Sequence, residues 1–152
     1  MRTGASAICA LAIAAAWLPS AAHDHATGVV KERMDMMEMM AKRMKAIRER
    51  IDGKRDLAAI KADAEAIASQ APHLVHLFPP GSTQRPTDAR ATIWQSWADF
   101  ERKAAALEVE SKKLISVLPN DFDALNTQVR AVTQTCRGCH EKYRVKGRKG
   151  DM

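Results

Sequence analysis

The sequence predicts an all-α protein, an antiparallel up-down-up-down four-helix bundle, and three observations support this fold class. The composition is rich in Ala, Leu, Met, Lys, Arg and Glu and has only 5% aromatic residues, which favours helix over strand. Four blocks carry apolar residues at helical spacing. Turn residues separate these blocks, and two of the three links are short, as in a bundle of antiparallel neighbours. A chain of 152 residues is long enough for one such domain.

The first 22 residues have the pattern of a secretory signal peptide. A positive charge at Arg2 precedes an apolar run over residues 5–18, which is too short to span a bilayer comfortably. Pro19 follows the run, and the small residues at 20–22 suit a signal peptidase. We therefore expect cleavage after Ala22, export to the periplasm of a bacterium without a stable membrane anchor, and a mature domain over residues 23–152.

The first two predicted helices occupy the blocks from Val30 to Ile51 and from Leu57 to Phe78. In the first block apolar residues recur every seven positions, and Asp52-Gly53 provides a C-terminal stop. In the second block the spacing continues past Pro72. Because proline lacks a backbone donor and clashes with the preceding turn, it should end or bend the helix there.

The last two predicted helices occupy the blocks from Ile93 to Leu118 and from Phe122 to Tyr143. The one long connection, residues 78–88, precedes the third helix, for which Asp88 is the expected N-cap. The following link is tight, and Asn120 or Asp121 should cap the fourth helix.

The fourth block contains the most informative motif, which is a C-x-x-C-H formed by Cys136, Cys139 and His140. On a helix, residues i, i+3 and i+4 lie on one face. Two thiols three residues apart can therefore add to the two vinyl groups of one haem, and the next imidazole can bind its iron. The sequence thus predicts one covalent haem c on the last helix, which agrees with export, since this attachment occurs on the exported side of the membrane.

Other interpretations of the two thiols explain the motif less well. Cys9 leaves with the signal peptide, so the mature chain keeps two cysteines. Two cysteines in an oxidising compartment usually form a disulfide. A zinc site needs more ligands than the remaining histidines, which are His23, His25, His73 and His76, readily supply. A redox dithiol would need a βαβ setting, which the pattern lacks. We expect His73 and His76 to lie at the surface.

A C-x-x-C-H close to the C-terminus of a four-helix chain resembles the class II c-type cytochromes, the cytochrome c′ family. The resemblance covers roughly residues 27–146. It includes an Arg four positions before a Met on the first helix, here Arg33 and Met37, with "FPPGS" at 78–82, "IWQSWADF" at 93–100 and "CRGCHEKYR" at 136–144. The resemblance implies thioethers to Cys136 and Cys139 and His140 as the proximal iron ligand.

Six of the eight methionines lie between residues 34 and 44, and one of them matches the position of the sixth iron ligand in this family. That position is Met37; family members with an apolar side chain there are five-coordinate, whereas low-spin members have a methionine. A rotation of ~100° per residue places Met40 and Met44 within ~60° of Met37, and Met39 nearly opposite, toward solvent. We therefore expect Met37 to bind iron, and a His/Met pair is familiar in electron transfer.

The resemblance assigns further roles around the haem. Arg33 lies on the inner seam of the first helix, where an unpaired charge is costly, so it would pair with a haem propionate. The alternative is that its side chain snorkels to the surface. Arg144 would lie beside the proximal imidazole, or would simply be a cation at a helix C-terminus. Phe78 would approach the distal face, and Trp97 would pack against the haem edge.

The favoured function is single-electron transfer between proteins without substrate turnover. The net charge is +6, or about +5 once Arg2 leaves with the signal peptide, and this balance suits acidic redox partners. A basic tail over residues 142–149 could steer such a partner, or could be a solvated chain end. Nucleic acid is not an expected partner, because the chain is exported and has no basic-aromatic motif. The resemblance also implies a homodimer through the first two helices.

Two alternatives stay open at this point. A five-coordinate cytochrome c′ that binds nitric oxide or carbon monoxide would use the methionines as core filling. A copper-binding bundle would use soft thioethers, those of Met34, Met37 and Met40, together with His23 and His25.

Overall fold

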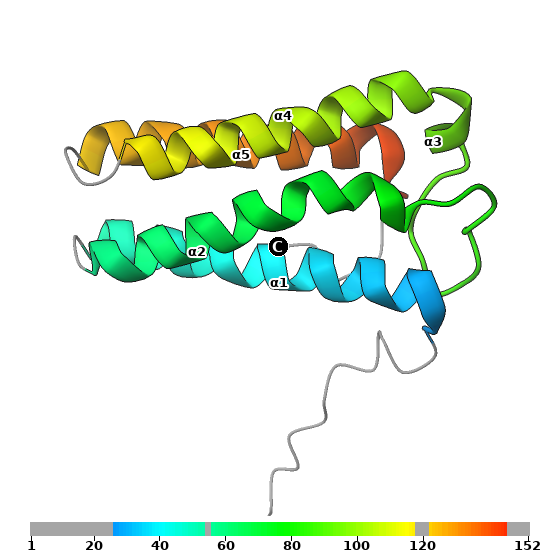
Figure 1. Ribbon diagram of the computed structural model, residues 1–152, viewed down its shortest axis with the longest axis horizontal. Coiled ribbons are helices and arrows are strands. Elements are labelled where there is room, and N and C mark those ends of the chain that lie inside the picture. The colour runs from blue at the N-terminus through cyan, green and yellow to red at the C-terminus, as the bar shows by residue number, and fades with distance from the viewer. Residues whose placement is uncertain (1–25, 54–55, 118–121, 146–152) are drawn as a thin grey trace, which may run out of the picture.

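The computed structural model describes residues 26–53, 56–117 and 122–145, which form an antiparallel four-helix bundle (Figure 1). The long helices are α1 (Gly28–Asp52), α2 (Leu57–Gln70), α4 (Trp97–Ser116) and α5 (Phe122–Tyr143). A 3-10 helix, η1 (Ala71–Leu77), continues α2, and α3 (Thr92–Gln95) is one turn that precedes α4. Successive long helices run in opposite directions, so the predicted fold class is confirmed.

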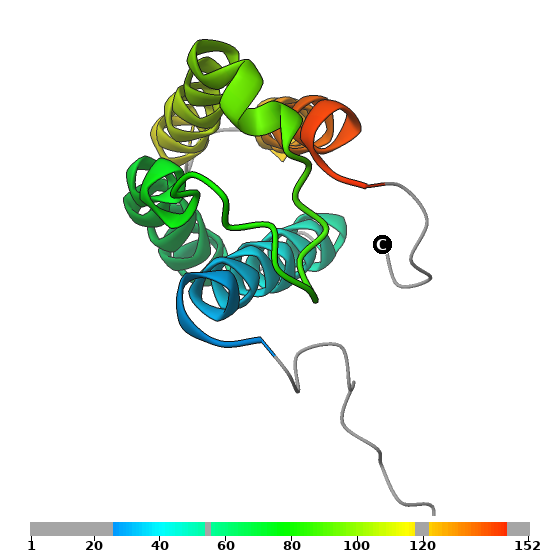
Figure 2. The same cartoon turned by 90° about the vertical axis from the view of Figure 1, so that its right-hand side faces the viewer.

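The bundle is held together by the apolar stripes that the helices turn toward its axis. Viewed along that axis, the helices form a ring in chain order (Figure 2). α2 packs against α1 and α4, and α4 packs against α5, whereas α1 and α5 meet less closely. Burial of apolar surface stabilises the fold by roughly 25 cal/mol per Å². The largest fully buried apolar side chains are Phe100, Ile47, Ile60, Ile67, Ile93, Leu114, Leu125 and Val132.

Two predicted helix ends are confirmed. α1 stops at Asp52, and Gly53 follows it as the C-cap. α2 ends at Gln70, and Pro72 lies in the first turn of η1, where its missing N–H interrupts no α-helical hydrogen bond. The apolar spacing of the second block continues through this change because η1 still faces the core.

The third helix begins later than predicted, and the prediction that Asp88 is its N-cap is wrong. The chain first forms α3 and then breaks at Ser96, whose φ of −130° and ψ of 43° are not helical, before α4 begins at Trp97. Asp88 instead contacts the residues after α5. Its carbonyl accepts a hydrogen bond from the backbone N–H of Val145 at 2.8 Å, and its carboxylate lies 3.5 Å from the guanidinium of Arg144. These long-range contacts override the local capping preference.

Three predictions concern residues outside the described ranges. These are the capping role of Asn120 or Asp121, the signal peptide over residues 1–22, and the histidines at 23 and 25. Among the described helices, none is both long and apolar enough to cross a bilayer.

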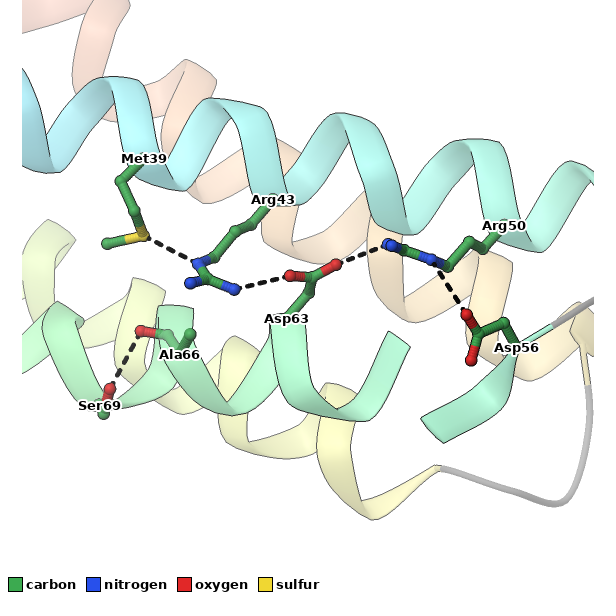
Figure 3. A network of polar contacts seen from close by, with 7 residues as sticks. All are labelled: Met39, Arg43, Arg50, Asp56, Asp63, Ala66 and Ser69. Atoms are coloured by element: carbon green, nitrogen blue, oxygen red, sulfur yellow. Dashed lines mark hydrogen bonds and ion pairs between the residues drawn. The ribbon is translucent and has the colours of Figure 1, made fainter. Parts of the chain in front are cut away.

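A polar network fastens α1 to α2 beside the core (Figure 3). Asp63 of α2 accepts hydrogen bonds from Arg43 at 2.7 Å and from Arg50 at 2.6 Å, and its side chain is 13% exposed. Arg43 also donates from Nε to the sulfur of Met39 at 3.2 Å. The prediction that Met39 faces solvent is therefore wrong. Met39 is half-buried and packs against the core, because α1 buries a flank toward α2 as well as its central seam.

Candidate functional site

The C-x-x-C-H motif lies in the last turns of α5. Cys136 and Cys139 are free thiols, half-buried and packed against the core, and His140 is exposed. The helix is continuous from Phe122 to Tyr143, so the thiols and the imidazole keep the one-face arrangement that the spacing predicts. The motif therefore lies at the border between the core and solvent.

Burial keeps both thiols protonated. It raises the pKa of Cys136, and it raises the pKa of Cys139 to about 11. The positive charges of Arg48 near Cys136 and of Lys103 near Cys139 oppose this effect without cancelling it. At neutral pH both groups are thus neutral thiols, whose S–H bond can add across a vinyl double bond to form a thioether.

Met37 lies on α1, which runs antiparallel to α5 and contacts it. Met37 is half-buried and packs against the core.

An aromatic cluster closes the core at this end. The ring centroid of Phe100 lies 4.8 Å from that of Phe78, 5.4 Å from that of Trp97 and 5.5 Å from that of Tyr143. Phe78 and Tyr143 are buried, and Trp97 is half-buried. Phe78 and Trp97, both predicted to lie near the haem, thus share one cluster, and Tyr143 connects it to the motif three residues after His140.

Tyr143 and its neighbour also attach the motif to α4. The Tyr143 hydroxyl donates to the carboxylate of Asp99 at 2.7 Å, and Lys142 donates to the same oxygen at 2.8 Å; Arg102 contacts the other oxygen. The hydrogen bonds from Lys142 and Tyr143 hold the pKa of Asp99 well below its usual range. Asp99 also raises the pKa of Lys142 through their hydrogen bond. An anion at the start of α4 therefore anchors the residues that directly follow His140.

Arg33 is buried, with 3% of its surface exposed, so it does not snorkel. Its terminal nitrogens donate to the carbonyl of Leu77 at 3.0 Å, to the hydroxyl and carbonyl of Ser82 at 3.1 and 2.9 Å, and to the hydroxyl of Thr87 at 2.7 Å. The guanidinium also lies 4.5 Å from the ring centroid of Phe78. Burial lowers the pKa of Arg33, but an arginine stays charged in proteins. These contacts engage the four N–H groups of its two terminal nitrogens.

Arg144 follows directly after α5 and faces the connection that leads to α3. Its backbone N–H donates to the carbonyl of His140 at 3.0 Å, and Ala89 and Arg144 form an isolated antiparallel bridge. The half-buried guanidinium is 3.5 Å from the carboxylate of Asp88. Arg144 is thus held by the loop on one side and by the turn of His140 on the other.

Some of these residues carry no signal in the sequence. Asp99 lies in the first turn of its helix, where acidic residues are common because of the helix dipole, and Ser82 and Thr87 lie in an ordinary polar connection. His73 and His76 are exposed, as predicted.

The residues fit a covalently attached haem. Cys136, Cys139 and His140 place two neutral thiols and an adjacent imidazole on one face of α5. Within the described ranges, no group of three or more His, Cys, Asp or Glu could hold a bare metal ion. When bound, the haem supplies a reversible one-electron iron couple.

The fold and site define a c-type haem protein built on a four-helix bundle, and the chain belongs to the cytochrome c′ family. Residues 28–144 match the family model described as Cytochrome C′. The family consists of periplasmic, non-enzymatic haem proteins. One haem c is attached through Cys136 and Cys139.

Individual relatives fall into two named groups. Cytochrome c-556 from Agrobacterium tumefaciens (strain II Chrys) is 31% identical over 121 residues, which cover 78% of this chain and 98% of the relative. Cytochrome c-556 from Agrobacterium fabrum is 32% identical, covering 80% and 84%. Among solved structures, a nitric oxide complex of a variant cytochrome c prime from Alcaligenes xylosoxidans has a TM-score of 0.70 and 30% identity, covering 78% and 94%. A cytochrome c′ with ligand-controlled dimer dissociation has a TM-score of 0.73 and 26% identity, covering 78% and 95%.

Proposed function

We propose that this protein carries single electrons in the periplasm through a haem whose iron is bound by His140 and Met37. The position of Met37 carries the proposal. Met37 is half-buried on α1 and packs against the core, and α1 contacts α5, which carries His140, so the two ligands would come from facing helices. A filled sixth position lets iron change its charge without exchanging ligands, and methionine raises the reduction potential.

The relatives named cytochrome c-556 support an electron carrier. The chain's own residues would hold the ligands in place. The hydrogen bonds of Asp99 to Lys142 and Tyr143 restrain the turn after His140. Arg33, four residues before Met37, ties α1 to the connection between η1 and α3. Phe78 and Trp97 would line the haem, Nε–H of Arg33 would approach a propionate, and Arg144 would adjust the surroundings of the imidazole.

The remaining features of the proposal follow from sequence and family. Residues 1–22 would be removed after Ala22 during export, leaving residues 23–152 as the cytochrome domain. The redox partners would be acidic proteins, because the chain is basic. The solved relative with ligand-controlled dimer dissociation supports a homodimer.

A second candidate is a five-coordinate cytochrome c′ that binds nitric oxide. The similarity to a solved nitric oxide complex favours it. In this case Met37 would pack over the haem without bonding to iron, since methionine fills irregular gaps readily.

The test is the absorption spectrum of the haem-loaded protein in both oxidation states, with and without carbon monoxide. We expect low-spin spectra and resistance to carbon monoxide. Met37→Ala should give a high-spin spectrum and ready carbon monoxide binding. Met39→Ala is the matched control: it is also half-buried on α1, but it bonds to Arg43 on the side of α2 and should keep the parent spectrum.

Each competing function has its own outcome. A high-spin parent that binds carbon monoxide would favour the gas-binding alternative. If both Met37→Ala and Met39→Ala kept the spectrum of the parent protein, Met37 would not be the ligand. A colourless protein with stoichiometric copper, made in cells able to attach haem, would favour the copper-binding bundle.

A further inference from the structure

A groove between α1 and α5 lies next to the haem-attachment turn but outside it. Its apolar floor contains the buried Ile51 and Val129, and its rim includes Arg48 and Thr133. Cys136 is three residues beyond Thr133, about 4.5 Å along the helix, and marks the edge of the motif nearer the groove. The groove continues from there toward the opposite end of the bundle, away from His140.

Two guanidinium groups border this groove without an acidic partner. Arg48 of α1 and Arg130 of α5 are both exposed, and neither forms an ion pair with any acid in the described part of the chain. Other arginines of α1 differ, because Arg43 and Arg50 share the carboxylate of Asp63. The two guanidiniums thus keep their charge and hydrogen-bonding capacity available for a ligand.

The rest of the lining suits a carboxylate. Asn126 and Gln134 add side chains that can donate hydrogen bonds, whereas the Thr133 hydroxyl already donates to the carbonyl of Val129 at 2.8 Å. The lining contains one acid, Asp52. Two arginines against one aspartate leave the groove positive. Arginine forms strong bidentate hydrogen bonds with carboxylates, and an apolar floor can accommodate the methylene groups of an acidic side chain.

The charge of this groove also reaches the attachment site. The thiol pKa of Cys136 is raised by burial, and the positive charge of Arg48 acts against that rise. A group bound at Arg48 is therefore electrostatically close to the cysteine that holds the haem edge.

We propose that this groove is the docking site for an acidic side chain of the redox partner, a protein with an acidic surface, and that electrons pass at the haem edge held by Cys136. The inference rests on the proposed electron-carrier function and adds the place and chemistry of partner recognition. Two unneutralised arginines beside the attachment turn would steer an acidic surface to the short path into the haem.

The binding test uses a hexaglutamate peptide titrated into ¹⁵N-labelled, haem-loaded protein at low ionic strength. The largest amide shifts are expected at Asn126, Thr133 and Gln134. The Arg48→Gln/Arg130→Gln double variant should lose them. The matched control, Lys45→Gln/Lys61→Gln, removes the same charge from exposed positions that pair with Glu49 and Glu65, and it should keep them. Shifts that survive in the arginine variant, or that centre on another surface, would overturn the proposal.

A kinetic test addresses electron transfer at the same place. Oxidation of the reduced protein by hexacyanoferrate(III), a trianion, should slow about fivefold at low ionic strength in the arginine variant and much less in the lysine control. Oxidation by the cationic tris(phenanthroline)cobalt(III) should not slow in either. An equal decrease of the oxidation rate in both variants would show that only net charge matters, and it would overturn the proposal that the groove is the docking site.

Different results would contradict the electron-carrier function and the docking groove. A high-spin wild-type protein that reacts slowly with both oxidants would contradict the electron-carrier function. A low-spin protein that reacts quickly, with the same hexacyanoferrate(III) rate in the arginine variant, would contradict only the groove.

Discussion

Tyr143 and Asp99 are joined by a hydrogen bond of 2.7 Å that connects the last turn of α5 to the first turn of α4. Lys142 donates to the same carboxylate oxygen at 2.8 Å. Both donors follow His140 within three residues, so one acidic side chain on α4 restrains the backbone beside the proposed iron ligand. This contact, the buried Arg33, the ion pairs of Asp63 and the two cysteines each lead to a testable prediction.

Removing the hydroxyl of Tyr143 should weaken this end of the bundle. Tyr143→Phe keeps the ring against Phe100 but loses the bond to Asp99, and the melting temperature should fall by roughly 3 °C. Differential scanning calorimetry measures the change. Ser69→Ala, which removes an exposed hydroxyl bonded only within its own helix, should melt like the parent. Equal melting of the tyrosine variant and the parent would mean that the hydrogen bond does not stabilise the fold.

The depressed pKa of Asp99 predicts a loss of stability in acid. A carboxyl whose pKa is lower in the folded state stabilises the protein above its unfolded pKa of about 3.9, and this stabilisation is lost as pH falls through the folded value. Asp99→Asn should therefore be less stable than the parent at neutral pH. The difference should shrink as pH falls from about 4 to about 2. Urea titrations at each pH measure it, and a difference that does not change with pH would refute this assignment.

Arg33 should contribute strongly to stability because its replacement removes a buried cation whose two terminal nitrogens make four hydrogen bonds. Arg33→Ala should lower the free energy of unfolding by about 3 kcal/mol, since Ser82 and Thr87 lose their donors and a cavity forms. The control is Lys31→Ala, which breaks an exposed ion pair with Asp35 and should cost less than about 0.5 kcal/mol. Similar losses for both variants would contradict the role of Arg33 as the anchor of the connection.

The two arginines that share Asp63 predict a second stability effect, between α1 and α2. Asp63→Asn should lower the free energy of unfolding by about 1–2 kcal/mol, because Arg43 and Arg50 lose a common, half-buried anion. Glu65→Gln breaks an exposed pair with Lys61 on the same helix and is the matched control, with an expected change near zero. High salt should reduce the difference in free energy of unfolding between the two variants only slightly, because Asp63 is poorly exposed.

The two thioethers should be separable by mutation. Cys136→Ser and Cys139→Ser should each keep one covalent link to the haem, whereas the double variant should carry none. Intact mass spectrometry of protein made in a host with haem-attachment machinery checks this directly. Haem that stays covalently bound to the double variant would contradict attachment through these two residues.

Several features of this protein were predictable because they are local properties of the chain. Apolar residues recur with helical spacing in four blocks, and such spacing makes one face of each helix apolar whatever its neighbours are. The stop at Gly53 and the change at Pro72 follow from backbone chemistry at single residues. The C-x-x-C-H motif is equally local, since its three groups share one face of one helix.

The errors and omissions all involve contacts between residues distant in the chain. Asp88 and Asp99 look like equivalent N-terminal acids in the sequence, yet Asp88 contacts the residues after α5 and Asp99 receives Tyr143 and Lys142. The helical rotation between Met37 and Met39 predicts that Met39 faces solvent, yet α2 covers that side of α1.

By itself, then, the sequence determined the helices, their order and the haem-attachment motif, because helical periodicity and motif spacing act within a few residues. Only the tertiary structure decided which groups surround that motif. The hydrogen bonds that Arg33 donates, the anchoring of Tyr143 by Asp99 and the groove lined by Arg48 and Arg130 depend on how four helices pack. Packing brings together residues that no local pattern relates.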